Sequence, residues 1–236
     1  PSVKYLVISA FLALCAAPAQ AVVVYSNNFE SGVLGAEWSG AGTIQGTQGY
    51  SAITGFGNMF LSNASTGNPA AASILTLTGL PAHTHINIGA MLAIIDSWDG
   101  SGDFPSGDFF DVSVDGVSIG AETYSNNGNP VTHSDTPVSI GTHLGFNNGG
   151  FHTDSAFDFT NPDMNDAIAH TASSVTIAFF ASGGGWQGGD DESWAIDSLT
   201  VEVLSEHLPI GVPEPMTLSL LGAGLAGLGM ARRKRA

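Results

Sequence analysis

The sequence predicts an all-β protein whose body is a single jelly-roll or lectin-like β-sandwich. Three observations support this fold class. Strand-like apolar runs recur along the body, clusters of Gly, Asn, Asp and Pro separate them, and apolar residues at helical spacing are nearly absent. Residues 22–207 are long enough for one domain with a substantial core, and they show no internal repeat. We therefore expect one domain over 22–207, flanked by two short terminal segments.

The expected strands follow one another at intervals typical of a sandwich. The clearest local pattern is a hairpin, because apolar residues alternate on both sides of Asp115-Gly116, a strong two-residue turn. Residues 161–170 predict one short helix or a loop. In chain order, the predicted strands cover 22–25, 59–62, 73–78, 85–95, 109–114, 117–119, 157–160, 175–181 and 194–203.

The N-terminal segment has the pattern of a secretory signal peptide, residues 1–21. Lys4 supplies the positive charge, residues 5–17 supply the apolar core, and Ala19-Gln20-Ala21 fits the small-x-small cleavage pattern of signal peptidase. A lipoprotein signal at Cys15 is the alternative, but a large residue precedes that cysteine. Without Cys15 the mature body has no cysteine, so disulfides and Cys-ligated zinc are excluded.

The C-terminal segment combines a proline motif, an apolar run and a basic tail. The two prolines predict an extended linker over 208–215, and the apolar run predicts a transmembrane helix over 216–231. That helix would be about 24 Å long, short for a hydrocarbon core of about 30 Å. The basic residues at 232–236 predict a cytoplasmic tail. The residues of the motif and the tail are Val212, Pro213, Glu214, Pro215, Arg232, Arg233, Lys234 and Arg235.

This three-part segment resembles the PEP-CTERM sorting signal. The resemblance implies processing by an exosortase, a membrane protease-transferase that cuts near the proline motif. It also implies a Gram-negative bacterium and delivery through an inner-membrane intermediate to the cell surface or the extracellular matrix. Exosortase substrates are typically exopolysaccharide or biofilm-matrix proteins. A plain C-terminal anchor is the alternative interpretation.

Charge is distributed very unevenly along the chain. No Lys or Arg occurs between Tyr5 and Ala231, although the chain carries 21 Asp and Glu and a formal net charge of −16. Nucleic-acid binding is therefore not expected, because phosphates need cationic side chains. The carboxylates also form two groups, one between Asp96 and Asp115 and one between Asp190 and Asp197.

Hard oxygen ligands on glycine-rich loops predict structural Ca²⁺, which accepts six to eight oxygens in loose geometry. Asp99-Gly-Ser-Gly-Asp103 resembles the start of a calcium loop, but it is not an EF-hand, since Phe104 and Phe110 occupy the positions of the required Gly and Glu. Two alternatives are turn-forming aspartates that are simply solvated and a salt-adapted surface.

A second resemblance involves three patches of the body: Phe29-Glu30, the run from Ile95 through Asp99 to Gly116, and Asp191-Glu192-Ser193-Trp194-Ala195-Ile196-Asp197. These are similar to a β-sandwich module of exported bacterial proteins and to MAM and laminin-G-like domains. Such domains often tie their first and last strands with calcium. The resemblance thus implies a metal site with ligands among Glu30, Asp96, Asp99, Asp103, Asp108 and Asp197.

The sequence lacks the usual catalytic patterns, including Glu-x-Asp-x-x-Glu, Gly-x-Ser-x-Gly and His-Glu-x-x-His. His83-Thr84-His85 would place two imidazoles on one strand face, as a zinc or copper pair needs, but no third ligand is evident. We therefore expect His83 and His85 at an edge or turn, and His143 and His170 in structural roles. A secreted glycoside hydrolase or lyase of lectin-like fold is the alternative function.

Tryptophans could bind sugar rings by stacking. Trp186 is the best candidate, because its glycine-rich loop predicts exposure, whereas Trp38 and Trp194 are expected in the core. The combined expectation is a non-catalytic, calcium-stabilised surface or matrix protein that binds glycan, with exopolysaccharide among its partners.

Overall fold

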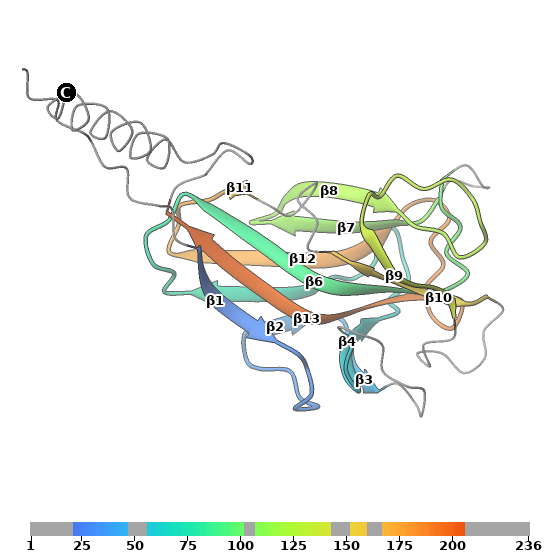
Figure 1. The fold of residues 1–236 in the computed structure, drawn as a ribbon, viewed down its shortest axis with the longest axis horizontal. Helices are drawn as coiled ribbons and strands as arrows, with labels where there is room; N and C mark the ends of the chain where they lie inside the picture. The colour runs from blue at the N-terminus through green and yellow to red at the C-terminus, as the bar shows by residue number, and fades with distance from the viewer. Residues whose placement is uncertain (1–20, 47–55, 102–106, 143–151, 160–166, 206–236) are drawn as a thin grey trace, which may run out of the picture. The chain divides into compact units, whose positions relative to one another are not determined.

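The computed structural model describes residues 21–46, 56–101, 107–142, 152–159 and 167–205, and these form two packed β-sheets (Figure 1). All of them lie in the first of two compact units, residues 1–206. None of the described residues forms a helix long and apolar enough to cross a membrane. The strands are β1 (Ala21–Asn27), β2 (Trp38–Gly40), β3 (Thr43–Gly46), β4 (Met59–Asn63), β5 (Ser73–Thr78), β6 (His85–Asp96), β7 (Phe109–Val114), β8 (Val117–Thr123), β9 (Thr136–Thr142), β10 (Asp154–Asp158), β11 (Ile168–Ala169), β12 (Ser174–Ser182) and β13 (Glu192–Leu204).

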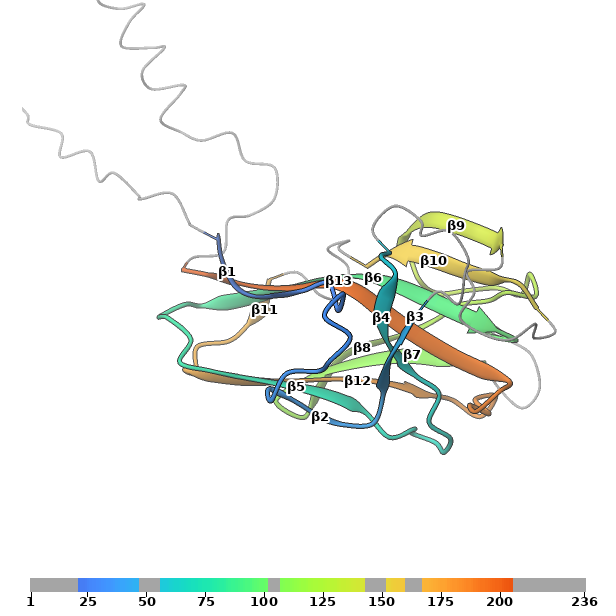
Figure 2. The ribbon, with the colours of Figure 1, turned by 90° about the horizontal axis from the view of Figure 1, so that it is seen from below.

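All strand pairings in the two sheets are antiparallel. One sheet has the order β3-β4-β13-β6-β10-β9, with β1 added beside β13 and β11 beside β6. The other has the order β2-β5-β12-β7-β8. Figure 2 shows the sheets as two stacked layers, with β6 and β13 in one and β5, β12 and β7 in the other. The predicted all-β sandwich is therefore confirmed.

The main core lies between the layers and follows from strand alternation. Along β12, every second residue is fully buried, including Val175, Ile177 and Phe179. Across the interface, Phe110 of β7 meets Trp194 of β13 edge to face, with ring centroids 5.2 Å apart. Burial of each such side chain contributes roughly 1.5–3 kcal/mol. The prediction that Trp38 and Trp194 belong to the core is confirmed.

The outer face of the eight-stranded sheet also carries buried apolar side chains. In the second half of β6 every residue is buried, so the strand contributes to both faces. Ala195 of β13, Ala93 of β6 and Ala156 of β10 lie directly opposite one another in adjacent strands. Together with Phe56, Phe60, Met91 and Ile95 they form a second apolar cluster.

β13 changes its neighbour part-way along its length. On one edge its first half pairs with β4 and its second half with β1, while β6 follows the other edge. The register with β6 shifts between Asp197 and Thr200, and Ser198 adopts a φ of 49°. This irregularity is a β-bulge, which bends the strand and lets it serve two partners.

Most strands with clear alternation lie where the sequence predicts them, and β5 and β7 match to the residue. The sequence missed β2, β3, β9 and β11, which are short or rich in Gly, Ser and Thr, so their patterns are weak. β10 begins at Asp154, three residues before the predicted 157. Of the predicted helix or loop over 161–170, the described part contains β11 and no helix. The signal peptide, except for Ala21, and all of 206–236 lie outside the described residues.

Candidate metal centre

Three carboxylates meet at one end of the sandwich. Asp99 follows β6, Asp108 immediately precedes β7, and Glu192 is the first residue of β13. One oxygen from each lies within 4.8 Å of the others. Because β7 belongs to one sheet and β6 and β13 to the other, this carboxylate cluster joins the ends of both layers.

Each carboxylate of the cluster uses one oxygen for a hydrogen bond within the protein. The Asp99 amide donates to Asp108 Oδ2 (2.7 Å), the Gln187 amide donates to Glu192 Oε2 (2.8 Å), and Asn127 Nδ2 donates to Asp99 Oδ1 (2.8 Å). The second oxygens of two of them, Asp108 Oδ1 and Glu192 Oε1, are buried, and while both groups are carboxylates neither oxygen receives a hydrogen bond. Their residues are 0% and 1% exposed, so bulk water does not compensate for the missing partners.

The electrostatics of the cluster oppose full ionisation. Burial, reinforced by the charges of Asp108, Asp191 and Asp99, raises the pKa of Glu192 to about 8. Burial, together with the charges of Asp99 and Asp191, raises the pKa of Asp108 to about 6, against the lowering effect of hydrogen bonds from the Asp99 amide and from a protonated Glu192 side chain. Without a cation, the two carboxyls can share a proton. A cation would instead stabilise both carboxylates.

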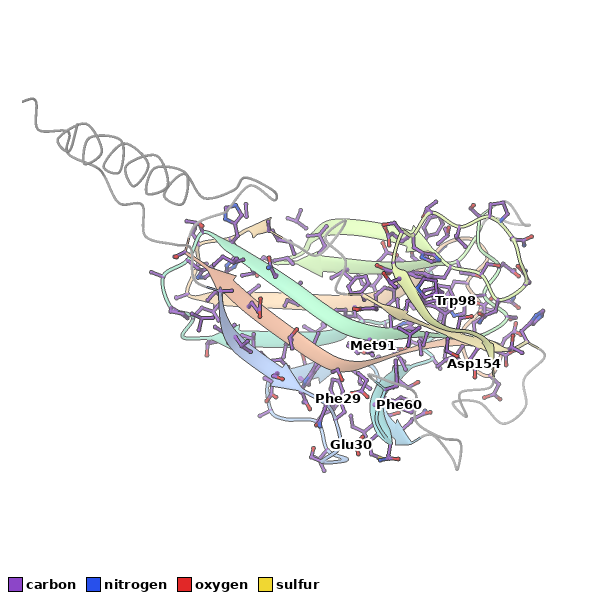
Figure 3. All side chains as sticks on the ribbon, viewed as in Figure 1. Phe29, Glu30, Phe60, Met91, Trp98 and Asp154 are labelled. Carbon is purple, nitrogen blue, oxygen red and sulfur yellow. The ribbon has the colours of Figure 1, made fainter. Side chains whose placement is uncertain are left out.

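Close backbone packing closes the loop that carries Asp99 and Asp108. A Cβ on Gly107 would lie 1.7 Å from the Gly100 carbonyl oxygen, so a side chain there would force the two ends of the loop apart. Glycine at this position lets Asp108 approach Asp99. Buried Trp98, labelled in Figure 3, donates from its indole nitrogen to the Ser193 carbonyl (2.8 Å). Trp98 precedes Asp99 and Ser193 follows Glu192, so this hydrogen bond connects the two segments that carry these carboxylates.

The donor set suits a hard divalent cation. All three side chains offer carboxylate oxygens, and Ca²⁺ prefers oxygen ligands and tolerates irregular geometry. The described residues contain no Lys or Arg to balance the charge. A carboxylate cluster that could hold a metal ion is therefore present, and Asp108 Oδ1 and Glu192 Oε1 are the atoms that most need one.

The structure brings together some of the predicted ligands and separates others. Asp99 and Asp108 lie in the cluster. Asp96 is not part of the cluster. Its Oδ1 accepts a hydrogen bond from the His152 amide (3.0 Å), and its own amide donates to Asp154 Oδ1 (3.2 Å). Asp103 lies outside the described residues.

The remaining two predicted ligands, Glu30 and Asp197, form a separate pair near the bulge of β13. Glu30 Oε1 accepts the amides of Asn58 and Met59, and Asp197 Oδ2 accepts the amide of Gly57. Burial, with the charge of Glu30, raises the pKa of Asp197 to about 6. Glu30 and Trp98 lie in different parts of the sandwich (Figure 3). In this pair the protein's own backbone amides bind the carboxylate oxygens, and the role as metal ligands stays a prediction.

Glu192 belongs to the acidic group between Asp190 and Asp197 but is not among the ligands that the sequence predicts. The signal that could have found it is its position at the start of a long strand, where β13 pairs with the end of β6 (Glu192 opposite Asp96). That pairing depends on the sheet order, which no local pattern encodes.

The expectation that Trp186 is exposed is wrong. Its side chain is 7% exposed, its ring packs edge to face on Trp98 at 5.1 Å, and its indole nitrogen donates to the Ser65 carbonyl (2.9 Å). The glycine-rich loop folds back over the end of the sandwich and buries the ring. Trp186 therefore offers no stacking platform for a sugar.

Solved structures with a similar fold include carbohydrate-binding modules and an adhesin domain. The CBM22-1 xylan-binding domain from Paenibacillus barcinonensis Xyn10C is 10% identical, covers 80% of this chain and 97% of its own, and has a TM-score of 0.37. The K2 cleaved adhesin domain of Lys-gingipain is 15% identical, covers 75% and 96%, and has a TM-score of 0.39. TmCBM61 in complex with β-1,4-galactotriose is 10% identical, covers 74% and 93%, and has a TM-score of 0.33.

Comparison at the sequence level identifies the C-terminal segment. No curated protein gives a significant match to the chain. The family model of the PEP-CTERM protein-sorting motif matches residues 211–235, which confirms the predicted sorting signal. The chain thus combines a β-sandwich body with a PEP-CTERM motif, which marks an exported protein sorted through a membrane-anchored step.

Proposed function

We propose that this protein is a non-catalytic component of the cell surface or extracellular matrix of a Gram-negative bacterium. Its β-sandwich holds Ca²⁺ at Asp99, Asp108 and Glu192 and binds glycan, with matrix exopolysaccharide as the expected partner. Signal peptidase and an exosortase process its two ends. The observation that carries the calcium part is the pair of buried oxygens, Asp108 Oδ1 and Glu192 Oε1, that lack a donor.

The glycan part of the proposal rests on the sorting signal and on the surface chemistry of the body. Proteins with this signal are typically delivered to an exopolysaccharide-rich matrix. A body with no Lys or Arg between Tyr5 and Ala231 repels anionic polymers, so neutral polysaccharide is the expected class.

The enzymatic alternative is favoured less. Glycoside hydrolysis needs two carboxyls on either side of an accessible bond. Asp108 and Glu192 do approach each other, and their raised pKa values would suit acid–base chemistry. Both are almost fully buried, however, which suits an enclosed ion better than a polysaccharide chain.

The test of the metal site is thermal unfolding of the full chain in detergent, with excess EDTA and then with millimolar Ca²⁺. A ligand at 100 times its dissociation constant stabilises by about 2.7 kcal/mol, so we expect the midpoint to rise by about 5–10 °C. Mg²⁺ should have a smaller effect because it demands a tighter octahedral shell. Asp108→Asn and Glu192→Gln should each abolish most of the shift.

Glu202→Gln is the matched control, because Glu202 lies on the same strand, ten residues beyond Glu192, and outside the cluster. It should keep the full calcium shift. An unchanged midpoint with Ca²⁺, or a shift that survives Glu192→Gln, would contradict the site. Glycan binding is tested separately by native electrophoresis through gels that contain neutral or acidic polysaccharide. Unretarded migration in all of them would contradict that part of the proposal.

A further inference from the structure

Two buried histidines from distant parts of the chain lie in direct contact. His83 precedes β6 and His170 follows β11, and their side chains approach with His83 Nε2 2.7 Å from His170 Nδ1. Both residues are less than 9% exposed. The sequence places His83 beside His85 and predicts only a structural role for His170, so the contact between His83 and His170 arises from the fold alone.

Both outer nitrogens of this histidine pair face groups that can only accept a hydrogen bond. His83 Nδ1 lies 2.6 Å from the Pro81 carbonyl oxygen, which has no hydrogen. His170 Nε2 lies 3.1 Å from Asp115 Oδ2. A carboxylate is likewise an acceptor, so each outer nitrogen must carry a hydrogen.

The inner contact needs a hydrogen as well, because two bare nitrogens 2.7 Å apart would repel each other. Three contacts thus require three hydrogens, whereas two neutral imidazoles carry two. We propose that His83 and His170 share one additional proton, so that the pair carries a single positive charge opposite Asp115. In a body without Lys or Arg, this pair supplies a buried cation.

The additional proton could instead reside on Asp115, but the surroundings of that carboxyl favour its ionised form. Its side chain is 46% exposed, and its second oxygen accepts the Thr176 amide (2.8 Å). Solvation and hydrogen bonding both stabilise a carboxylate. The neighbouring titratable residue His85 contacts Thr84 Oγ1 through its Nδ1 (2.9 Å).

The histidine pair joins three segments at the end of the sandwich where β13 finishes. The pair links the segment before β6, the β7–β8 turn at Asp115 and the segment after β11. In addition, the His170 amide donates to the Thr84 carbonyl (3.0 Å), and the Thr84 amide donates to the carbonyl of Leu204, the last residue of β13 (2.8 Å). The shared proton therefore helps to hold the end of β13.

If the pair holds one additional proton, the stability of the fold decreases both when the pH rises above its optimum and when it falls below it. In the unfolded chain both histidines are neutral above about pH 6.5 and both are charged below it. Above that range the folded state binds more protons, so stability falls as the pH rises. Below it the unfolded state binds more protons, two against one, so stability falls as the pH decreases.

The decisive variant is Asp115→Asn. The asparagine oxygen can still accept the Thr176 amide, while its NH₂ can donate to His170 Nε2, so the three contacts then need only two imidazole hydrogens. Asn-Gly is also a favoured hairpin turn, so β7 and β8 should keep their connection. The additional proton should then be lost without loss of the fold.

The experiment is ¹⁵N NMR of the full chain in detergent, labelled at histidine, near pH 6.5 and with EDTA so that no metal replaces the proton. Three protonated ring nitrogens in the wild-type pair and two in Asp115→Asn are expected. A wild-type pair with only two protonated ring nitrogens would overturn the proposal. This measurement is decisive by itself, because it does not depend on the variant.

A second readout is the difference in unfolding midpoint between wild type and Asp115→Asn as a function of pH. We expect this difference to change by about 3–6 °C between pH 6.5 and pH 9, as for one lost hydrogen bond to a charged group. A difference that is constant with pH would show a purely structural contact and contradict the shared proton.

Discussion

Individual buried side chains in this protein differ in how completely their polar atoms are satisfied. Trp186 and Asp111 each have a hydrogen-bond partner, Ser65 and Ser182 respectively. Asp108 and Glu192 each retain one oxygen without a donor. An unsatisfied buried polar group costs more free energy than one hydrogen bond contributes. We therefore expect Trp186 and Asp111 to act structurally, and Asp108 and Glu192 to bind an ion.

Truncation of Trp186 should destabilise the fold without a specific effect on glycan binding. Trp186→Ala removes a buried ring that packs on Trp98, and we expect a loss of about 3–5 kcal/mol in unfolding free energy. Trp186→Phe keeps most of the packing and loses mainly the bond to Ser65, about 0.5–1.5 kcal/mol. Urea denaturation measures both, with exposed Val33→Ala as the control. A fully stable Trp186→Ala variant that fails to bind glycan would reverse this assignment.

Asp111→Asn should stabilise the protein at neutral pH. Burial raises the pKa of Asp111 above its ordinary value, against the smaller effect of the Ser182 hydroxyl. The folded state therefore binds the proton more tightly than the unfolded state, and stability is lost as the pH rises through this range. We expect the unfolding midpoint of the variant at pH 7 to lie above that of the wild type. The gain should vanish below about pH 4; a gain that persists there would have another origin.

Among the elements, β13 does most to connect the molecule. Its bulge at Ser198 lets it pair with β4 and then with β1, and the carboxylates of Glu30 and Asp197 bind the backbone that leads into β4. The same strand begins at the carboxylate cluster. The two acidic sites are thus attached to one strand.

Gly57→Ala should loosen this junction. A Cβ on Gly57 would lie 1.9 Å from Glu30 Oε1, so the carboxylate would have to leave the amides of Asn58 and Met59. We expect a loss of about 1–3 kcal/mol in unfolding free energy. In a Glu30→Ala background the same change should cost much less. Equal costs in both backgrounds, measured by chemical denaturation, would show that Glu30 is not the obstacle.

At the scale of the whole molecule, the dominant feature is uncompensated negative charge. The net charge is −16, and all but one of the 21 carboxylates lie in the body, where Lys and Arg are absent. Self-repulsion of this kind destabilises a compact state, and bound cations or mobile salt relieve it. The proposed calcium ion and the protonated histidine pair would each remove part of the repulsion.

Monovalent salt should therefore stabilise the protein even when divalent cations are absent. Raising NaCl from 0.01 M to 1 M in EDTA shortens the screening length from about 30 Å to about 3 Å. We expect the unfolding midpoint to rise steadily over this range. The control is the same measurement in sucrose at equal osmotic strength, which separates charge screening from the exclusion of solute from the protein surface. A midpoint that is insensitive to NaCl would mean that the carboxylates are too widely spaced to repel one another.

Local signals in the sequence determined the fold class, the Asp115-Gly116 hairpin, the core placement of Trp38 and Trp194, and the sorting motif. Each of these depends on residues that are adjacent or nearly adjacent in the chain. Alternation, turn chemistry and the proline-apolar-basic order can therefore be read without knowledge of the sheet order.

The tertiary structure alone decided which distant residues meet. It placed Glu192 beside Asp99 and Asp108, joined His83 to His170 across 87 positions, and buried Trp186 against Trp98. These contacts depend on strand order, register and the path of long loops, and many arrangements of the same strands satisfy the same alternation. The acids and histidines are thus visible in the sequence, but their partners are set by the packing of two sheets that contributes most of the folding free energy.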